Sequence, residues 1–242
     1  MATITTTDAA LLRLLQLVSP ALPVGAFSYS EGLEVQQQHG ALASRAAVQH
    51  WLEAELARGA VAIETAALAE LTALIEQLRS GVAAAAAALL ELDGWLLAQR
   101  EAAEVRAQQR QMGQSLLLLL ADLGFPLPAS SQTRTSANGR ATAPLAWPAA
   151  FAWAACSLEL ASPAVEEAYL YGWVANQISA AVRLVPLGPT QGQRLQLSLA
   201  GLIAERAEAL AVADPRSLWN GGVGAGLAQL QHAELYSRLF RS

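Results

Sequence analysis

Apolar residues recur three and four positions apart along most of the chain, a spacing that places side chains on one face of an α-helix. No strand-length segment alternates with a period of two, and no internal repeat is present. The pattern predicts an all-α protein, a single domain over residues 1–242 built as a helical bundle of about ten helices. Three apolar stripes show the spacing: Leu11, Leu14, Leu15 and Val18; Val48, Trp51, Leu52 and Leu56; and Leu68, Leu71, Ile75 and Leu78.

Proline, glycine and capping residues indicate where the predicted helices begin and end. The first helix begins near Thr7 and is stopped by Ser19-Pro20, and its many leucines predict a nearly buried element. Ser44 is placed as an N-cap, and Gly40 as the C-cap of the helix before it. Asp93-Gly94 is expected to separate two long helical segments.

Two segments are predicted to be irregular. The polar, low-complexity stretch over residues 128–144 contains proline at both ends and is expected to be a mobile loop. The glycines between Gly221 and Gly226 are expected to form a flexible joint before a final helix that contains His232.

The last eight residues combine two aromatic, two leucine and two arginine side chains. On a helix, Leu235 and Leu239 would lie four residues apart, as would Tyr236 and Phe240, which gives two adjacent apolar rows. Aromatic and arginine side chains are typical of interface hot spots. The tail over residues 227–242 is therefore expected either to bind a partner protein or to dock on its own domain.

Composition narrows the possible chemistry. Apolar residues make up 54% of the chain and charged residues 14%, so part of the surface is expected to be apolar and contacted. The chain has no lysine, which excludes a Schiff-base lysine and a P-loop lysine. A net charge of −5 without a basic run argues against nucleic-acid binding.

The chain also lacks the marks of secretion and of membrane insertion. A single cysteine, Cys156, excludes an internal disulfide. The N-terminus has no positive region followed by an apolar core, and the longest apolar runs are too short to span a bilayer. A cytoplasmic location without membrane contact is the expectation.

Candidate reactive residues are few. His39, His50 and His232 are far apart in sequence and do not have the spacing of a metal-binding helix. Gly221–Gly226 does not fit a phosphate-binding loop. Arg100–Gly113 places Arg100 and Glu104, and Arg106 and Arg110, four residues apart, which is compatible with a solvated charged face. Gly113 inside this strong helix indicates the close approach of another helix.

Three segments and the C-terminus resemble one family. Residues 14–34 (LLQLVSPALPVGAFSYSEGLE), 111–117 (QMGQSLL) and 179–194 (SAAVRLVPLGPTQGQR) resemble its N-terminal, central and later motifs, and residues 236–242 (YSRLFRS) resemble its ending. By order, spacing and length, the chain is similar to UreF, a urease accessory protein. Glu31 departs from the histidine often found there, and residues 218–222 are less polar than usual.

The resemblance implies an all-α homodimer without enzymatic activity or a cofactor of its own. UreF-like proteins bind UreD, also called UreH, and the GTPase UreG, and the assembly delivers nickel to apo-urease. Nickel and GTP would then be bound by the partners. The resemblance places partner-binding residues at these positions: Pro23, Gly25, Phe27, Tyr29, Ser30, Gly32, Glu34, Glu104, Arg106, Met112, Gly113, Arg183, Tyr236, Arg238, Leu239, Phe240 and Arg241.

An alternative function from another class remains open at the level of sequence. Cys156 could serve as the nucleophile of a helical-bundle enzyme with a nearby carboxylate, although an apolar helix around it is typical of a buried thiol. A purely structural oligomer is a third possibility.

Overall fold

The computed structural model describes residues 8–128 and 145–242. Every regular element in these two ranges is an α-helix or a 3-10 turn, which confirms the predicted all-α class. The predicted loop over residues 128–144 lies almost entirely outside the described residues. The α-helices are α1 (Asp8–Leu17), α2 (Leu33–Gln38), α3 (Arg45–Arg58), α4 (Ala60–Ala66), α5 (Leu68–Arg79), α6 (Ala83–Ala98), α7 (Ala103–Asp122), α8 (Trp147–Ser157), α9 (Ala164–Leu184), α10 (Pro189–Leu210) and α11 (Val223–Gln231). The 3-10 turns are η1 (Ala26–Ser28), η3 (Pro215–Ser217) and η4 (His232–Glu234).

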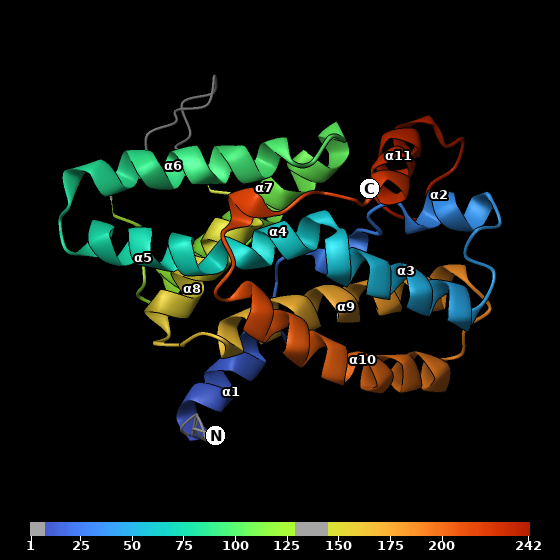
Figure 1. Ribbon diagram of the computed structural model, residues 1–242, viewed down its shortest axis with the longest axis horizontal. Coiled ribbons are helices and arrows are strands. Elements are labelled where there is room, and N and C mark those ends of the chain that lie inside the picture. The colour runs from blue at the N-terminus through green and yellow to red at the C-terminus, as the bar shows by residue number, and fades with distance from the viewer. Residues whose placement is uncertain (1–7, 129–144) are drawn as a thin grey trace.

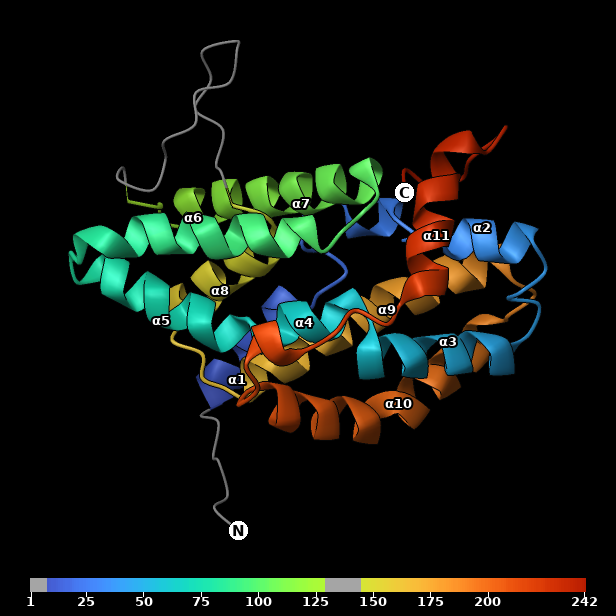
Figure 2. The same ribbon diagram turned by 45° about the horizontal axis from the view of Figure 1, so that its top comes forward.

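The helices form two groups that meet at α4 (Figures 1 and 2). In one group α8 packs against α5 and α7, and α5 also packs against α6. In the other group α9 packs along α10 and contacts α1, α2 and α3. Helix α4 contacts both α5 and α9, and it is buried at every position. One continuous hydrophobic core therefore runs through both groups.

Local sequence accounts for several helix ends. The Ser44 side chain accepts a hydrogen bond from the Ala47 N–H at 3.2 Å, so the predicted N-cap of α3 is confirmed. Gly40 follows α2 with a φ of 76°, the left-handed conformation that ends a helix readily at glycine. The apolar stripe Leu68, Leu71, Ile75 and Leu78 is buried on α5. These signals act over a single turn, which explains why the sequence predicts them correctly.

Helix α1 differs from the prediction of a nearly buried element. Its side chains Leu11, Leu12 and Leu15 are 46%, 66% and 52% exposed. Helix α1 packs mainly against α9 and projects from the body of the molecule (Figure 1), so only part of its surface is covered. Apolar content alone does not distinguish a buried helix from one with an uncovered apolar face.

The predicted break at Asp93-Gly94 is wrong, because α6 continues to Ala98. The Asp93 carboxylate instead accepts a hydrogen bond from the Ala146 N–H at 2.8 Å, at the N-cap position of α8. Burial raises the pKa of Asp93 to about 6. A residue that would break a helix locally thus serves a neighbouring helix, and the real break lies between α6 and α7, around Arg100.

The C-terminal segment also differs from its prediction. Helix α11 begins at Val223, inside the glycine-rich segment that was expected to be a joint, and the final residues after η4 are not helical. The two apolar rows expected on a terminal helix are therefore absent from this described segment. Tyr236 is fully exposed at 106%, whereas Phe240 is only 4% exposed. The reason is the docking of this segment on the protein's own surface, as described below.

Candidate functional site

The turn between α1 and α2 is shaped by residues with positive φ. Gly25, Glu31 and Gly32 have φ values of 73°, 49° and 91°. A Cβ atom on Gly32 would lie 3.1 Å from the Cβ of Ala228, so glycine here permits α11 to approach the start of α2. The turn thus places Tyr29, Ser30 and the predicted site residues around them beside the C-terminal segment.

Residues 235–242, called the tail from here on, dock on this turn. The Leu239 N–H and the Phe240 N–H donate to the two oxygens of the Glu34 carboxylate, at 2.7 and 3.0 Å. The Arg241 N–H donates to the Ser28 carbonyl at 2.9 Å. The main-chain oxygen of Ser242 accepts from the Ser30 hydroxyl at 2.7 Å and from the N–H groups of Ser30 and Glu31. These bonds take the place of helical ones, which explains why the tail is not helical.

Arg183, at the C-terminal end of α9, joins the turn and the tail. Its Nη1 donates to the Phe27 carbonyl at 3.1 Å, and its guanidinium carbon lies 4.4 Å from the centroid of the Phe240 ring. This is a cation–π geometry around an almost fully buried ring. The structure thus confirms the expectation of docking on the same domain for Phe240.

Helix α7 contributes Glu104 to the same contact. Its Oε1 accepts from Arg238 Nη1 at 2.6 Å, and its Oε2 lies 2.8 Å from His232 Nδ1. His232 Nε2 lies 3.3 Å from Glu34 Oε2, and the ring is completely buried. The spacing of Arg100 and Glu104 suggested a local pair, whereas Glu104 in fact binds residues more than a hundred positions away.

A buried polar network that the sequence reasoning missed lies beneath the turn. Arg100 is 3% exposed and forms ion pairs with Glu64 at 2.7 Å and Glu31 at 3.3 Å. The Tyr169 hydroxyl donates to Glu64 at 2.9 Å, and the Trp173 indole N–H donates to Glu31 at 3.2 Å. The expectation of a solvated charged face is therefore wrong at Arg100, because residues from α4 and the turn cover it.

Gln108 of α7 connects this network to the tail. Its Nε2 donates to Glu31 Oε1 at 2.8 Å, while its Oε1 accepts from the Ser242 hydroxyl. The sequence offers no local signal for such a role, because a glutamine on a helix with several polar neighbours is usually exposed. The network fixes the conformation of the turn on which the tail docks.

Arg106, Met112 and Gly113 of α7 have different positions. Arg106 Nη1 donates to the carbonyls of Arg100 and Glu101, both at 2.6 Å, and so closes the turn between α6 and α7. A Cβ atom on Gly113 would lie 2.6 Å from the Leu145 carbonyl oxygen. The predicted close approach at Gly113 is confirmed, although the neighbour is the chain entering α8 rather than the body of a helix.

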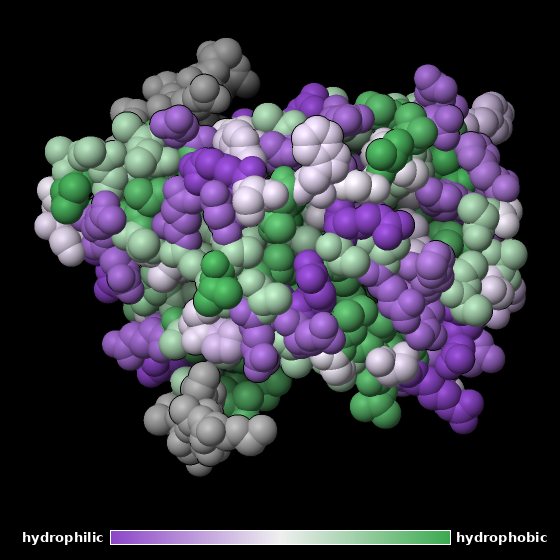
Figure 3. All heavy atoms as spheres, in the orientation of Figure 1, coloured by the Kyte–Doolittle hydropathy of each residue, from purple (hydrophilic) through white to green (hydrophobic). Residues whose placement is uncertain are grey.

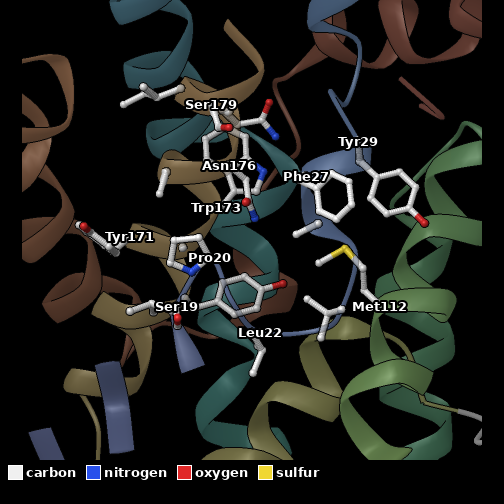
Figure 4. A pocket seen from close by; sticks show the side chains of 18 of the residues that line it. Ser19, Pro20, Leu22, Phe27, Tyr29, Met112, Tyr171, Trp173, Asn176 and Ser179 are labelled. Atoms are coloured by element: carbon white, nitrogen blue, oxygen red, sulfur yellow. The ribbon is translucent and has the colours of Figure 1, made fainter. Parts of the chain in front are cut away.

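Met112 lines a cavity of about 510 Å³ together with Phe27, Tyr29 and Arg183. In Figure 4, Phe27 and Met112 lie on one side of this cavity, and Trp173 and Asn176 of α9 lie on the other. Four predicted site residues from the turn, α7 and α9 are thus brought to one place.

The exposed part of the site is apolar. Phe27, Tyr236 and Leu239 are 69%, 106% and 53% exposed, and we call these three residues the tail surface. Helix α11 adds a row of exposed side chains four and three residues apart, Val223, Leu227 and Leu230, and Figure 3 shows hydrophobic atoms at the surface over this helix. The sequence reasoning missed this row because it interpreted the segment as a glycine joint.

The environment of Cys156 disfavours a nucleophilic role. The residue is 9% exposed, and burial raises the pKa of its thiol to about 11. A thiol with this pKa is protonated at neutral pH, whereas a nucleophile requires the thiolate. Its Sγ donates weakly to the Thr72 carbonyl at 3.9 Å, as expected of a structural cysteine.

Two surveys of the described residues bear on function. Over residues 8–128 and 145–242, no group of three or more His, Cys, Asp or Glu side chains is arranged to hold a metal ion. Within the same ranges, no helix is both long enough and apolar enough to cross a membrane.

Fold and site together define an all-α protein with exposed aromatic and leucine side chains over a buried network of charges. The UreF family model matches residues 42–200. The chain is 41% identical over 239 residues to the urease accessory protein UreF of Thermosynechococcus vestitus, covering 98% of this chain and 99% of the relative. It is 38% identical over 242 residues to that of Alkalilimnicola ehrlichii, covering 100% of both chains. The chain belongs to the UreF family.

Proposed function

We propose that this protein is a scaffold of urease maturation that binds UreD (UreH) and the GTPase UreG, so that the assembly delivers nickel to apo-urease. Membership of a family of urease accessory proteins supports this role. The protein acts in the cytoplasm and as a homodimer. Nickel is the cargo, and the partner proteins bind both the nickel and the GTP.

The observation that carries the proposal is the uncovered apolar surface at the C-terminus. The tail surface and the α11 row together place six large apolar side chains at the exterior, each at least 44% exposed. Monomeric proteins rarely expose large contiguous apolar patches without a binding role. Arg238 and Arg241 border the tail surface, and arginine beside aromatic residues is characteristic of binding hot spots.

The internal bonding of the charged residues supports a binding role rather than a catalytic one. Glu31, Glu34, Glu64 and Glu104 are all engaged with arginine, histidine or main-chain groups of the same chain. They position the turn and the tail, and the tail surface is left to contact a partner. UreD is the partner that we assign to this surface.

The test uses Tyr236→Ala, because this side chain is fully exposed and its removal leaves the fold intact. We expect about a thirtyfold or greater loss of affinity for UreD, since truncation of a hot-spot aromatic side chain costs at least about 2 kcal/mol of binding free energy. Leu197→Ala is the matched control, because Leu197 is 77% exposed on α10, away from the tail. Equal capture by the two variants would contradict the proposed surface.

The role itself is tested by urease activation. Apo-urease incubated with nickel, GTP, UreD and UreG is expected to reach high activity only when this protein is added. Full activation without it, or co-purification with neither UreD nor UreG, would contradict the proposed scaffold.

A further inference from the structure

The cavity of about 510 Å³ beside the turn has unpaired polar atoms in its wall (Figure 4). Gln109 of α7 and Gln177 of α9 line it and are only 3% and 2% exposed. The Oε1 atom of each has no hydrogen-bond partner among the described residues. Because buried polar groups in native proteins are almost always paired, a cavity wall with two such oxygens is suited to a ligand that donates hydrogen bonds.

The neighbours of these oxygens define the remaining polar groups. The Nε2 of Gln109 donates to Glu64 Oε1 at 3.5 Å, so the amide nitrogen faces the buried network and the oxygen is left over. Gln196 of α10 also lines the cavity, and its buried Nε2 atom has no partner in the described part of the chain. The buried atoms of the wall thus include two free acceptors and one free donor.

The buried charges of the wall are compensated within the chain. Glu31 and Glu64 line the cavity, and both form ion pairs with Arg100. An ionised ligand next to them would therefore lose its water without gaining a counter-charge, which is costly in a buried site. A carboxylate would in addition face the free oxygens of Gln109 and Gln177, and it has no proton to donate to them. An uncharged ligand is favoured for these reasons.

Aromatic side chains form much of the rest of the wall, among them Tyr29, Phe151, Tyr169 and Trp173. Such side chains pack favourably against a flat aromatic ring. A mostly apolar wall with a few polar groups, and a volume within about 300–1,000 Å³, is typical of a small-molecule site.

The cavity reaches the surface of the molecule. Phe27 of the turn, Ser179 of α9 and Gln193 of α10 all line it and are exposed to solvent. A small molecule can therefore enter from this rim, whereas Gln109 and Gln177 lie in its buried part.

We infer that this cavity is a binding site for a small, uncharged aromatic carboxamide. A –CONH₂ group carries two N–H donors and one carbonyl acceptor, which matches the free oxygens of Gln109 and Gln177 and the free Nε2 of Gln196. The aromatic part of the wall accommodates the ring. The site does not depend on the proposed function, because it is formed by groups inside this chain and not by the contact with UreD.

Calorimetric titration of the full chain near neutral pH tests the site. Benzamide is the probe, and benzoate is the matched control, because the two differ only in the amide that becomes a carboxylate. We expect saturable one-to-one binding of benzamide with a Kd of about 1 mM or tighter, and at least about tenfold weaker binding of benzoate. Absence of saturable benzamide binding would show that the cavity holds only water and would overturn the proposal. Equal affinity for benzoate would overturn the recognition of an amide.

A pair of variants locates the binding. Gln177→Leu removes a free acceptor and retains most of the volume, so the variant should be at least as stable as the wild type in thermal unfolding. Its Kd for benzamide should rise about fivefold or more, as expected for the loss of one buried hydrogen bond. Gln191→Leu is the control and should bind benzamide as the wild type does, because Gln191 is exposed on α10 outside the cavity. Unchanged affinity in a folded Gln177→Leu variant would overturn the site.

Nitrogen NMR of the unmodified protein gives a second measurement, which decides the question if Gln177→Leu does not fold. The side-chain amide signals of Gln109, Gln177 and Gln196 should shift on addition of benzamide and saturate together, while the Gln191 signal stays in place. Shifts confined to residues outside the cavity would overturn the assignment.

Discussion

At the scale of single residues, buried charge distinguishes this protein from an ordinary helical bundle. Arg100, Glu31 and Glu64 are all at most 5% exposed. Each is paired with a residue distant in sequence, so its cost of burial is offset only in the folded state. Substitutions here are therefore expected to affect stability more than their number of contacts suggests.

Arg100→Met should be strongly destabilising. The substitution retains most of the buried volume but leaves Glu31 and Glu64 without their shared cation, and breaking a buried ion pair in this way costs about 3–5 kcal/mol. Urea unfolding provides the measurement. Arg45→Met, at an exposed position, is the control and should change the free energy of unfolding by less than about 0.5 kcal/mol. A loss no larger than that of the control would show that the ion pairs are not important.

The buried carboxyl group of Glu55 should make the stability of the protein depend on pH. Burial raises its pKa from 4.5 to about 7, so between these values the folded protein holds a proton that the unfolded chain has lost. The free energy of unfolding should therefore fall as pH rises from about 4.5 to about 7, by roughly 3 kcal/mol, and this contribution stays lost at higher pH.

The Glu55→Gln variant tests this dependence. Since the amide does not titrate, unfolding by urea at several pH values should show a smaller decline than in the wild type. Glu53→Gln, on the same helix, is the control and should preserve the decline. An unchanged decline in Glu55→Gln would assign the effect to another group.

At the scale of elements, close backbone contacts decide which helices meet. The chain entering α8 passes directly over Gly113 of α7, and the Asp93 side chain of α6 caps α8. Helices α6, α7 and α8 thus meet at one place, because Gly113 has no side chain to keep α7 and α8 apart and because Asp93 of α6 bonds to the start of α8. The tolerance of a helix to substitution depends here on its neighbours more than on its own propensity.

Gly113→Ala tests this packing. A methyl group 2.6 Å from the Leu145 carbonyl would force α7 and the start of α8 apart, so a loss of about 1–3 kcal/mol is expected in spite of the better helix propensity of alanine. Gly201→Ala in α10 is the matched control, because nothing lies within 4 Å of its added Cβ. The control should gain up to about 1 kcal/mol in thermal or urea unfolding. If both variants became more stable than the wild type, the chain at Leu145 would be shown to shift easily and make room for the added methyl group.

At the scale of the whole molecule, the tail joins three distant parts of the chain. It contacts the turn before α2, α7 through Glu104 and α9 through Arg183. Since the tail contains no α-helix, its contribution to stability and its contribution to helical content can be measured separately.

Deletion of residues 233–242 should leave the circular dichroism of the helices nearly unchanged. The loss of the buried Phe240 ring, about 2 kcal/mol or more, should lower the melting temperature by several degrees. Capture of UreD should be abolished, because Tyr236 and Leu239 are removed as well. Global unfolding of the shortened chain would show instead that the tail is part of the core.

Much of this architecture could be predicted from the sequence by itself. The period of the apolar residues determined the all-α class, and local signals such as Ser44 and Gly40 determined helix ends. The motifs around residues 14–34 and 236–242 determined the family. These features depend on interactions within a few residues or on the residue pattern, so they can be predicted from the sequence without a structure.

Only the tertiary structure decided which side chains meet. The sequence suggested a helix for the tail, a break at Asp93 and a solvated Arg100, and each prediction was wrong because a distant residue supplied the partner. Glu34 replaced the helical bonds of the tail, Ala146 bound Asp93, and Glu31 and Glu64 covered Arg100. Local propensity amounts to about 1 kcal/mol per residue at most, apart from proline, whereas leaving a buried charge or polar group unpaired costs more. Long-range pairing therefore determined the conformation wherever the two were in conflict.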